Sequence, residues 1–139
     1  MLLEIGLTDI SNNVEKYGTE VDESRLKKVE KMKRAIQLIQ NYNQDLYIDM
    51  AEAELGNLVL HDWEFEPVPD KPEHSRLIDK DTPEEKEHNS KVFERAREIQ
   101  KQEGDELFEI LKGQDYTKFD DKVDFYKQFD GSGLNSWWD

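Results

Sequence analysis

Residues 82–113 read TPEEKEHNSKVFERAREIQKQEGDELFEILKG, and the rest of the predicted fold is built around them. Thr82 and Glu85 stand three residues apart, the spacing of a capping box, and Pro83 occupies the first helical position, where proline is tolerated. Gly113 provides the left-handed residue that commonly ends a helix. The stretch therefore predicts one long helix between these two signals.

A stripe of apolar side chains runs along this predicted helix. Its members recur at spacings of three and four residues, which is the period of one helix face: Val92, Phe93, Ala96, Ile99, Leu107, Phe108, Ile110 and Leu111. A face of this kind is stable only when it packs against other apolar surface. The chain must therefore supply further amphipathic elements.

Two such elements are predicted upstream of it. A helix over residues 22–42 carries an apolar stripe formed by Leu26, Val29, Met32, Ala35, Ile36, Leu38 and Ile39. A helix over residues 45–60 carries another, formed by Leu46, Tyr47, Met50, Ala51, Leu55 and Leu58. The short connection between them favours an antiparallel helical hairpin. Acidic residues of the second helix (Asp49, Glu52 and Glu54) are expected to face the basic residues that lie between Arg25 and Arg34 on the first.

The other segments give weaker signals. Residues 1–13 have no partner strand, so they are predicted to be an N-terminal arm or short helix docked on the core. Three prolines (Pro67, Pro69 and Pro72) predict an extended connection at 61–81. Trp63, Phe65 and Val68 are expected to pin the first half of this connection to the core. A short helix is predicted near residues 120–128.

These segments predict an all-α fold. It comprises a helical hairpin, one long helix, a short C-terminal helix and an aromatic tail, within a single helical domain over residues 1–139. A proline-bearing loop at 61–81 and a tail at 130–139 complete the predicted organisation.

The charge balance limits the partners. The 139 residues include 33 Asp and Glu against 19 Lys and Arg, which gives a formal net charge of −14. Such a chain repels free nucleic acid and anionic membranes, so no direct nucleic-acid binding and no membrane association are expected. The absence of cysteine and of any apolar run approaching ~18 residues favours a cytoplasmic protein.

The C-terminal Trp137-Trp138-Asp139 is the most unusual local feature. Each indole carries about 200 Å² of surface that is unfavourable in water. The tail is therefore expected either to fold back onto its own domain or to anchor a partner, as aromatic side chains often do at interfaces.

The same tail carries a resemblance. The sequence Asp-Gly-Ser-Gly-Leu-x-x-Trp-Trp-Asp at 130–139, after Glu-Leu-Phe-x-Ile-Leu-Lys-Gly at 106–113, resembles the ends of small uncharacterised acidic proteins of bacteriophages and other large DNA viruses. The resemblance implies a viral setting and action in a host cytoplasm. It transfers no residue roles.

An enzymatic alternative uses carboxylates. Helical pyrophosphohydrolases hold Mg²⁺ with Glu-Glu-x-x-Glu on one helix and Glu-x-x-Asp on the next. Here Glu84-Glu85-Lys86-Glu87-His88 has histidine where the third glutamate belongs. A metal-dependent hydrolase using Glu94, Glu98 and Glu106 is the alternative that remains, while no catalytic residue, metal or cofactor is assigned.

The sequence thus favours a non-enzymatic protein-binding module. Its acidic surface would bind a basic, nucleic-acid-handling protein, and the module would act on that protein as an inhibitor or polyanion mimic. A virion or scaffold component held by the aromatic tail is a second possibility. The predicted partner-binding residues are Trp137, Trp138, Asp139, Asp49, Glu52, Asp62, Glu64 and Glu66.

Overall fold

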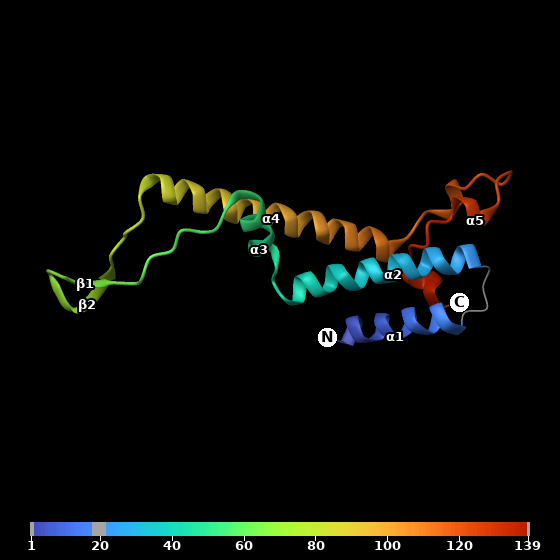
Figure 1. Cartoon of the computed structure of the whole chain (residues 1–139), viewed down its shortest axis with the longest axis horizontal. Helices are drawn as coiled ribbons and strands as arrows, with labels where there is room; N and C mark the ends of the chain where they lie inside the picture. The colour runs from blue at the N-terminus through green and yellow to red at the C-terminus, as the bar shows by residue number, and fades with distance from the viewer. Residues whose placement is uncertain (1, 18–21, 139) are drawn as a thin grey trace. The chain divides into compact units, whose positions relative to one another are not determined.

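The computed structural model describes residues 2–17 and 22–138 and is mostly helical (Figure 1). Contacts divide the chain into two compact units. Unit 1 comprises Met1–Leu46 and Gln100–Asp139, and unit 2 comprises Tyr47–Ile99. Each of these units has a hydrophobic core of its own.

The long helix α4 (Pro83–Lys112) confirms the reading of residues 82–113 and contributes to both units. Both hydrogen bonds of the capping box form: Thr82 N donates to Glu85 Oε2 at 3.1 Å, and Glu85 N donates to Thr82 Oγ1 at 3.2 Å. Gly113 follows the helix with φ +81°. Most of the predicted stripe is buried or half-buried, but Phe93 and Phe108 are 40% and 63% exposed. Their inclusion in the packed face was wrong.

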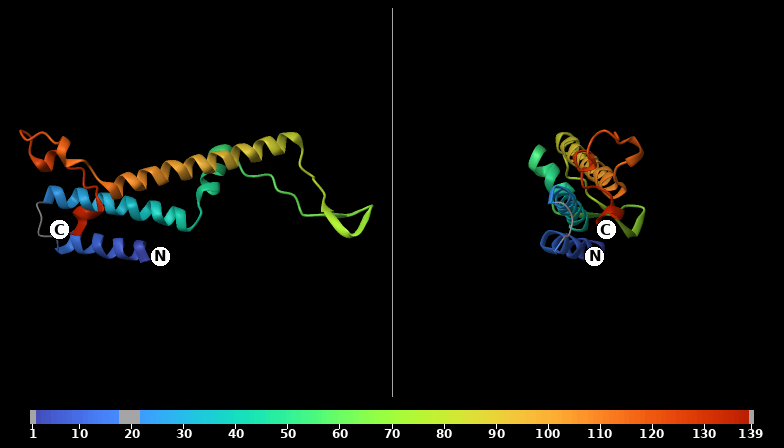
Figure 2. Two further views of the ribbon diagram at one scale, coloured as in Figure 1. Left: turned by 180° about the vertical axis from the view of Figure 1, so that it is seen from behind. Right: turned by 90° about the vertical axis from the view of Figure 1, so that its right-hand side faces the viewer.

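In unit 1, helix α1 (Leu2–Tyr17) packs beside α2 (Asp22–Asn43), as Figures 1 and 2 show. The predicted N-terminal arm or short helix is thus a helix of 16 residues. The core gathers side chains from four elements: Leu7, Met32, Ala35, Leu38, Ile39, Ile110 and Trp137. The stripe predicted on α2 is therefore confirmed, except that Leu26 is 59% exposed.

The chain after α4 forms three short helices, η1 (Tyr116–Lys118), α5 (Phe125–Gln128) and η2 (Leu134–Trp138). The helix predicted near residues 120–128 is shorter than expected. Aromatic rings hold this segment together, with Phe125 stacked on Phe129 at a centroid distance of 5.3 Å. Gln128 adds hydrogen bonds to both Asp120 N and Asp120 O, so the segment is closed locally.

Glycines let the tail approach the helices backbone to backbone. A Cβ on Gly131 would lie 2.2 Å from the carbonyl oxygen of Lys27, and a Cβ on Gly113 would lie 2.7 Å from Cα of Gly133. Gly133 N donates to Ile110 O at 2.7 Å. The Asp-Gly-Ser-Gly stretch thus allows the backbone of the tail to pack closely against α2 and the end of α4 within unit 1.

In unit 2, helix α3 (Tyr47–Leu55) packs on α4 through a core of Tyr47, Ala51, Val92, Ala96 and Ile99. The helix ends at Leu55 and not at residue 60, because Gly56 follows it with φ +100°. This left-handed conformation terminates the helix.

The all-α prediction needs correction in the same unit. Strands β1 (Phe65–Val68) and β2 (Lys71–Leu77) form a small antiparallel sheet, in which Phe65 pairs with Leu77 and Glu66 with Arg76. The register shifts between Pro67 and Val68. Prolines did not prevent pairing because proline is compatible with the open edges of a two-stranded sheet and with bulges.

Ion pairs connect α4 to α2 and to α3. Arg34 on α2 makes two hydrogen bonds of 2.8 Å to the Glu106 carboxylate, and Glu54 on α3 pairs with Arg95 at 2.6 Å. Each pair joins a shorter helix to α4 within one unit, the first within unit 1 and the second within unit 2.

The Arg34–Glu106 pair should be visible in a carboxyl titration. The hydrogen bond from Arg34 holds the pKa of Glu106 below its ordinary value of 4.5. The stabilisation is therefore present above pH 4.5 and is lost as the pH falls through the lowered pKa. In Arg34→Met the pKa of Glu106 should rise toward 4.5, measured by ¹³C NMR of the carboxyl carbon. Arg76→Met, which removes a guanidinium elsewhere, should leave it unchanged; an unmoved Glu106 titration in Arg34→Met would contradict the pairing.

Candidate functional site

We call residues 61–81, which contain the two strands, the arm. The chain that leads into the arm is tied to α4 by side chains of that helix. The Asn89 amide makes two hydrogen bonds of 2.9 Å with the backbone of Val59, one to its N–H and one to its C=O. His88 Nε2 lies 2.8 Å from Asn57 O. Helix α4 therefore fixes where the arm begins.

Large apolar side chains of the arm point into solvent. Trp63 is 79% exposed and Phe65 59% exposed, and their rings form an edge-to-face pair with centroids 6.5 Å apart. Leu77 on β2 is 53% exposed, and Leu60, the residue just before the arm, is 77% exposed. The prediction that Trp63 and Phe65 pin this segment to the core was therefore wrong. Val68, half-buried, is the member of that set with the most cover.

The failed prediction has a physical cause. An apolar alternation shows that a strand has one apolar face, but not whether a second layer covers that face. In unit 2, the apolar residues of α3 and α4 pack against each other, and every residue of β2 is exposed. A two-stranded hairpin without a covering layer is marginally stable in water. Exposure of these two aromatic rings to water is thus unfavourable in free energy, and burial against a partner surface would remove that unfavourable term.

All the acidic residues predicted to bind a partner, apart from Asp139, lie in unit 2. Asp62 and Glu64 are exposed on either side of Trp63, while Glu66 is half-buried next to Phe65. Glu64 pairs with Lys80 at 2.7 Å and Glu66 pairs with Arg76. The four side chains are between 29% and 64% exposed, and ion pairs so open to water contribute little to stability. The arm holds seven acidic residues against three basic ones, so its net charge is −4.

The two other acids predicted for this surface lie on α3. Asp49 is exposed. The Glu52 carboxylate accepts a hydrogen bond of 2.8 Å from Leu58 N, so it orders the chain after the helix. Asp49 is therefore the better candidate for a charged binding surface, because the Glu52 carboxylate is already bonded to the backbone of Leu58.

A histidine–carboxylate cluster lies where the arm meets α4. His61 Nε2 is 2.7 Å from Glu85 Oε2 and 3.7 Å from Asp81 Oδ1, and we call these three residues the His61 cluster. The hydrogen bond with Glu85 raises the pKa of His61, and the same bond lowers the pKa of Glu85. Among the described residues, this is the group of His, Asp and Glu side chains whose oxygen and nitrogen atoms converge closely enough to hold a metal ion.

The carboxylates of the hydrolase alternative do not converge in this way. Glu98 lies 3.3 Å from Arg95, and Glu106 is bound by Arg34. Glu94 is exposed on α4. Within the residues that the structure describes, none of these three glutamates belongs to a metal-ligating group.

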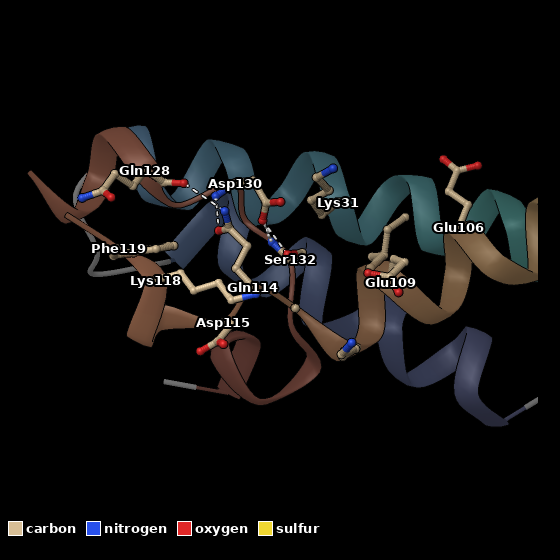
Figure 3. Close-up of a pocket in the computed structure, with 13 residues that line it drawn as sticks. Lys31, Glu106, Glu109, Gln114, Asp115, Lys118, Phe119, Gln128, Asp130 and Ser132 are labelled. Carbon is tan, nitrogen blue, oxygen red and sulfur yellow. Dashed lines mark hydrogen bonds between the residues drawn. The ribbon is translucent and has the colours of Figure 1, made fainter. Parts of the chain in front are cut away.

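Unit 1 contains a pocket of about 680 Å³ between α2, the end of α4 and the chain that follows it (Figure 3). Its polar groups bond with one another: Gln114 Nε2 donates to Gln128 O at 3.0 Å, and Gln114 Oε1 accepts from Asp130 N at 2.8 Å. Asp130 in turn accepts from Ser132 N at 2.8 Å. The pocket wall is therefore an ordered connection, in which Asp130 and Ser132 have structural roles.

Trp137 of the predicted aromatic tail lies in the interior of unit 1. Trp137 is 2% exposed, belongs to the unit 1 core, and donates from Nε1 to Gly131 O at 2.7 Å. This is the position expected if the tail folds back, and it leaves little of the Trp137 ring for a partner. Asp139 and the side chain of Trp138 lie outside the described residues.

Sequence reasoning missed the exposed aromatics of the arm and the His61 cluster. The signal for the first was present, since Trp63 and Phe65 are flanked by carboxylates and followed by three prolines. No signal marked the second, because His61, Asp81 and Glu85 have no ligand spacing in the sequence.

Among residues 2–17 and 22–138, none of the helices has an apolar stretch of the length that spans a lipid bilayer. Comparisons with protein-family models, with curated proteins and with solved structures find no match to this chain.

Proposed function

We propose that this protein is a non-enzymatic protein-binding module whose arm docks on a partner with a basic surface around an apolar pocket. The observation that carries the proposal is the exposure of the Trp63–Phe65 pair, 79% and 59%, with Asp62, Glu64 and Glu66 beside it. Aromatic side chains are the commonest interface anchors, and they gain most when a pocket removes them from water.

Charge selects the partner class. The arm is acidic and the whole chain carries −14, so long-range attraction favours basic surfaces and accelerates association with them. Proteins that handle nucleic acid present such surfaces to a polyanion. We therefore propose a nucleic-acid-handling protein as the partner, and competition with nucleic acid as the way in which binding changes its activity.

The test compares three variants of the full chain. After a basic partner has been captured and purified, its affinity is measured for the parent, for Trp63→Ser/Phe65→Ser and for Asp62→Asn/Glu64→Gln/Glu66→Gln. The aromatic double variant should bind at least tenfold more weakly, because an interface anchor is worth about 2 kcal/mol or more. The neutralised variant should bind more slowly and show a weaker dependence on salt.

Phe108→Ser is the matched control, because Phe108 is 63% exposed but lies on α4 in unit 1. It should bind like the parent. Duplex DNA should compete with the parent for the partner if the polyanion proposal holds. Equal affinity of the aromatic double variant and the parent would refute the docking role of the arm. Simultaneous binding of DNA and the parent would refute mimicry while leaving docking intact.

A further inference from the structure

We propose that His61, Asp81 and Glu85 form a binding site for a divalent transition-metal ion of the zinc class, which joins the two ends of the arm to the first turn of α4. The site does not depend on the proposed partner. Each residue offers one ligand atom, and these three atoms lie within 4.8 Å of one another.

The composition of the cluster points to this class of ion. One imidazole nitrogen and two carboxylate oxygens are the ligand types that zinc sites with an open position use. Calcium and magnesium prefer sets made only of oxygen atoms. The histidine therefore separates this cluster from the many exposed acidic groups of the chain.

The distances also fit. Ligands at about 2.0–2.2 Å from a tetrahedral zinc ion lie roughly 3.3 Å from each other. The observed His61–Asp81 separation of 3.7 Å is close to that value. The His61–Glu85 separation of 2.7 Å is a direct hydrogen bond, and exchange of its proton for a metal ion requires these two atoms to move apart by about 0.6 Å or more.

Two stretches of chain bring the ligands together, one with His61 and one with Asp81 and Glu85, and both are anchored. Glu85 is held in the first turn of α4 by the capping box, which places its carboxylate at the helix start. The chain before His61 is held by the double hydrogen bond between Val59 and Asn89. Preorganised ligands lose little conformational freedom on binding, so these anchors favour metal affinity.

The neighbouring lysines are bound to other carboxylates. Lys80 Nζ pairs with Glu64 at 2.7 Å, and Lys86 pairs with Asp79. Both ammonium groups thus have partners outside the His61 cluster. In addition, His61 and Asp81 line a cavity of about 340 Å³, which gives room for the water molecule that completes the coordination of the ion.

Occupation of the site would change the arm. His61 and Asp81 are its first and last residues, so an ion between them closes a loop of about twenty residues at its base. A hairpin without a covering layer gains order when its ends are held together. The metal ion would therefore preorganise the exposed strands.

Titration of the full chain with Co²⁺, an optical substitute for Zn²⁺, tests the site. We expect one ion per chain, visible in the d–d absorption bands, and displacement of Co²⁺ by Zn²⁺. His61→Gln, Asp81→Asn and Glu85→Gln should each weaken the affinity at least tenfold. Glu85→Gln keeps the capping hydrogen bond, since glutamine also serves at this position, so α4 should start where it does in the parent.

His74→Gln is the matched control, because His74 lies on β2 inside the arm and outside the His61 cluster. It should bind Co²⁺ like the parent. In addition, Zn²⁺ should shift the amide NMR signals of residues 61, 81 and 85. The proposal is overturned if the parent binds no Co²⁺ at millimolar concentration, if His61→Gln and Glu85→Gln bind as tightly as the parent, or if His74→Gln abolishes binding.

Discussion

Replacement of Gly131 by alanine is expected to lower the free energy of unfolding by roughly 3 kcal/mol or more. The new Cβ would lie 2.2 Å from Lys27 O and 2.3 Å from Lys27 C. Both are backbone atoms of α2, so they cannot turn aside as a side chain would. The φ of +88° adds a cost, because a residue with a Cβ is disfavoured there. Urea unfolding followed by circular dichroism measures the difference.

Gly104→Ala is the control for this prediction. Gly104 lies inside α4, and a Cβ there meets nothing within 4 Å. Alanine at that position should be neutral or raise the free energy of unfolding by about 0.5–1 kcal/mol, because glycine is the poorer helix former. If Gly131→Ala and Gly104→Ala had the same effect, the tail could not be packed against α2 as described.

Trp137→Ala is expected to cost about 3–5 kcal/mol, the usual range for a large aromatic side chain removed from a core. Trp137 is 2% exposed and packs with Leu7, Met32 and Ile110. The change leaves a cavity among side chains from three helices and removes the hydrogen bond from Nε1 to Gly131 O. The same urea titration reports the loss.

Two further tryptophan variants separate the contributions. Trp137→Phe keeps most of the ring volume and loses the hydrogen bond, so about 1–3 kcal/mol of the loss should remain. Trp63→Ala removes an indole that is 79% exposed and should change the free energy of unfolding by less than about 0.5 kcal/mol. A large effect at Trp63 with none at Trp137 would reverse the assignment of core and surface.

The parts of the fold predicted correctly depend on local interactions. Thr82 and Glu85 form a capping box because they are three residues apart, and Gly113 follows the helix because it tolerates a positive φ. The apolar stripe of α2 likewise depends on a repeat within one helix. Information of this kind lies in neighbouring residues, so the sequence alone is sufficient to identify it.

The parts predicted wrongly depend on what covers a face. Trp63 and Phe65 were predicted to anchor the arm to a core. They remain exposed because the apolar faces of α3 and α4 pack against each other. Residues 1–13 were predicted to be an arm or a short helix. Residues 2–13 belong to a 16-residue helix that packs on α2, and this packing partner lies further along the chain. Competition between apolar faces for a limited number of partners is a property of the assembled chain.

The long capped helix, the acidic balance and the glycine-rich tail with its two indoles can be identified from the residues alone. Packing of the folded chain places Trp137 in a core, leaves Trp63 in solvent, and brings His61 to Asp81 and Glu85. The difference follows from the range of the interactions, because caps and helix periods act over three or four residues. The burial of Trp137 against α1 and α2, and the approach of His61 to Asp81 and Glu85, instead join residues twenty or more positions apart, so they depend on how each unit packs.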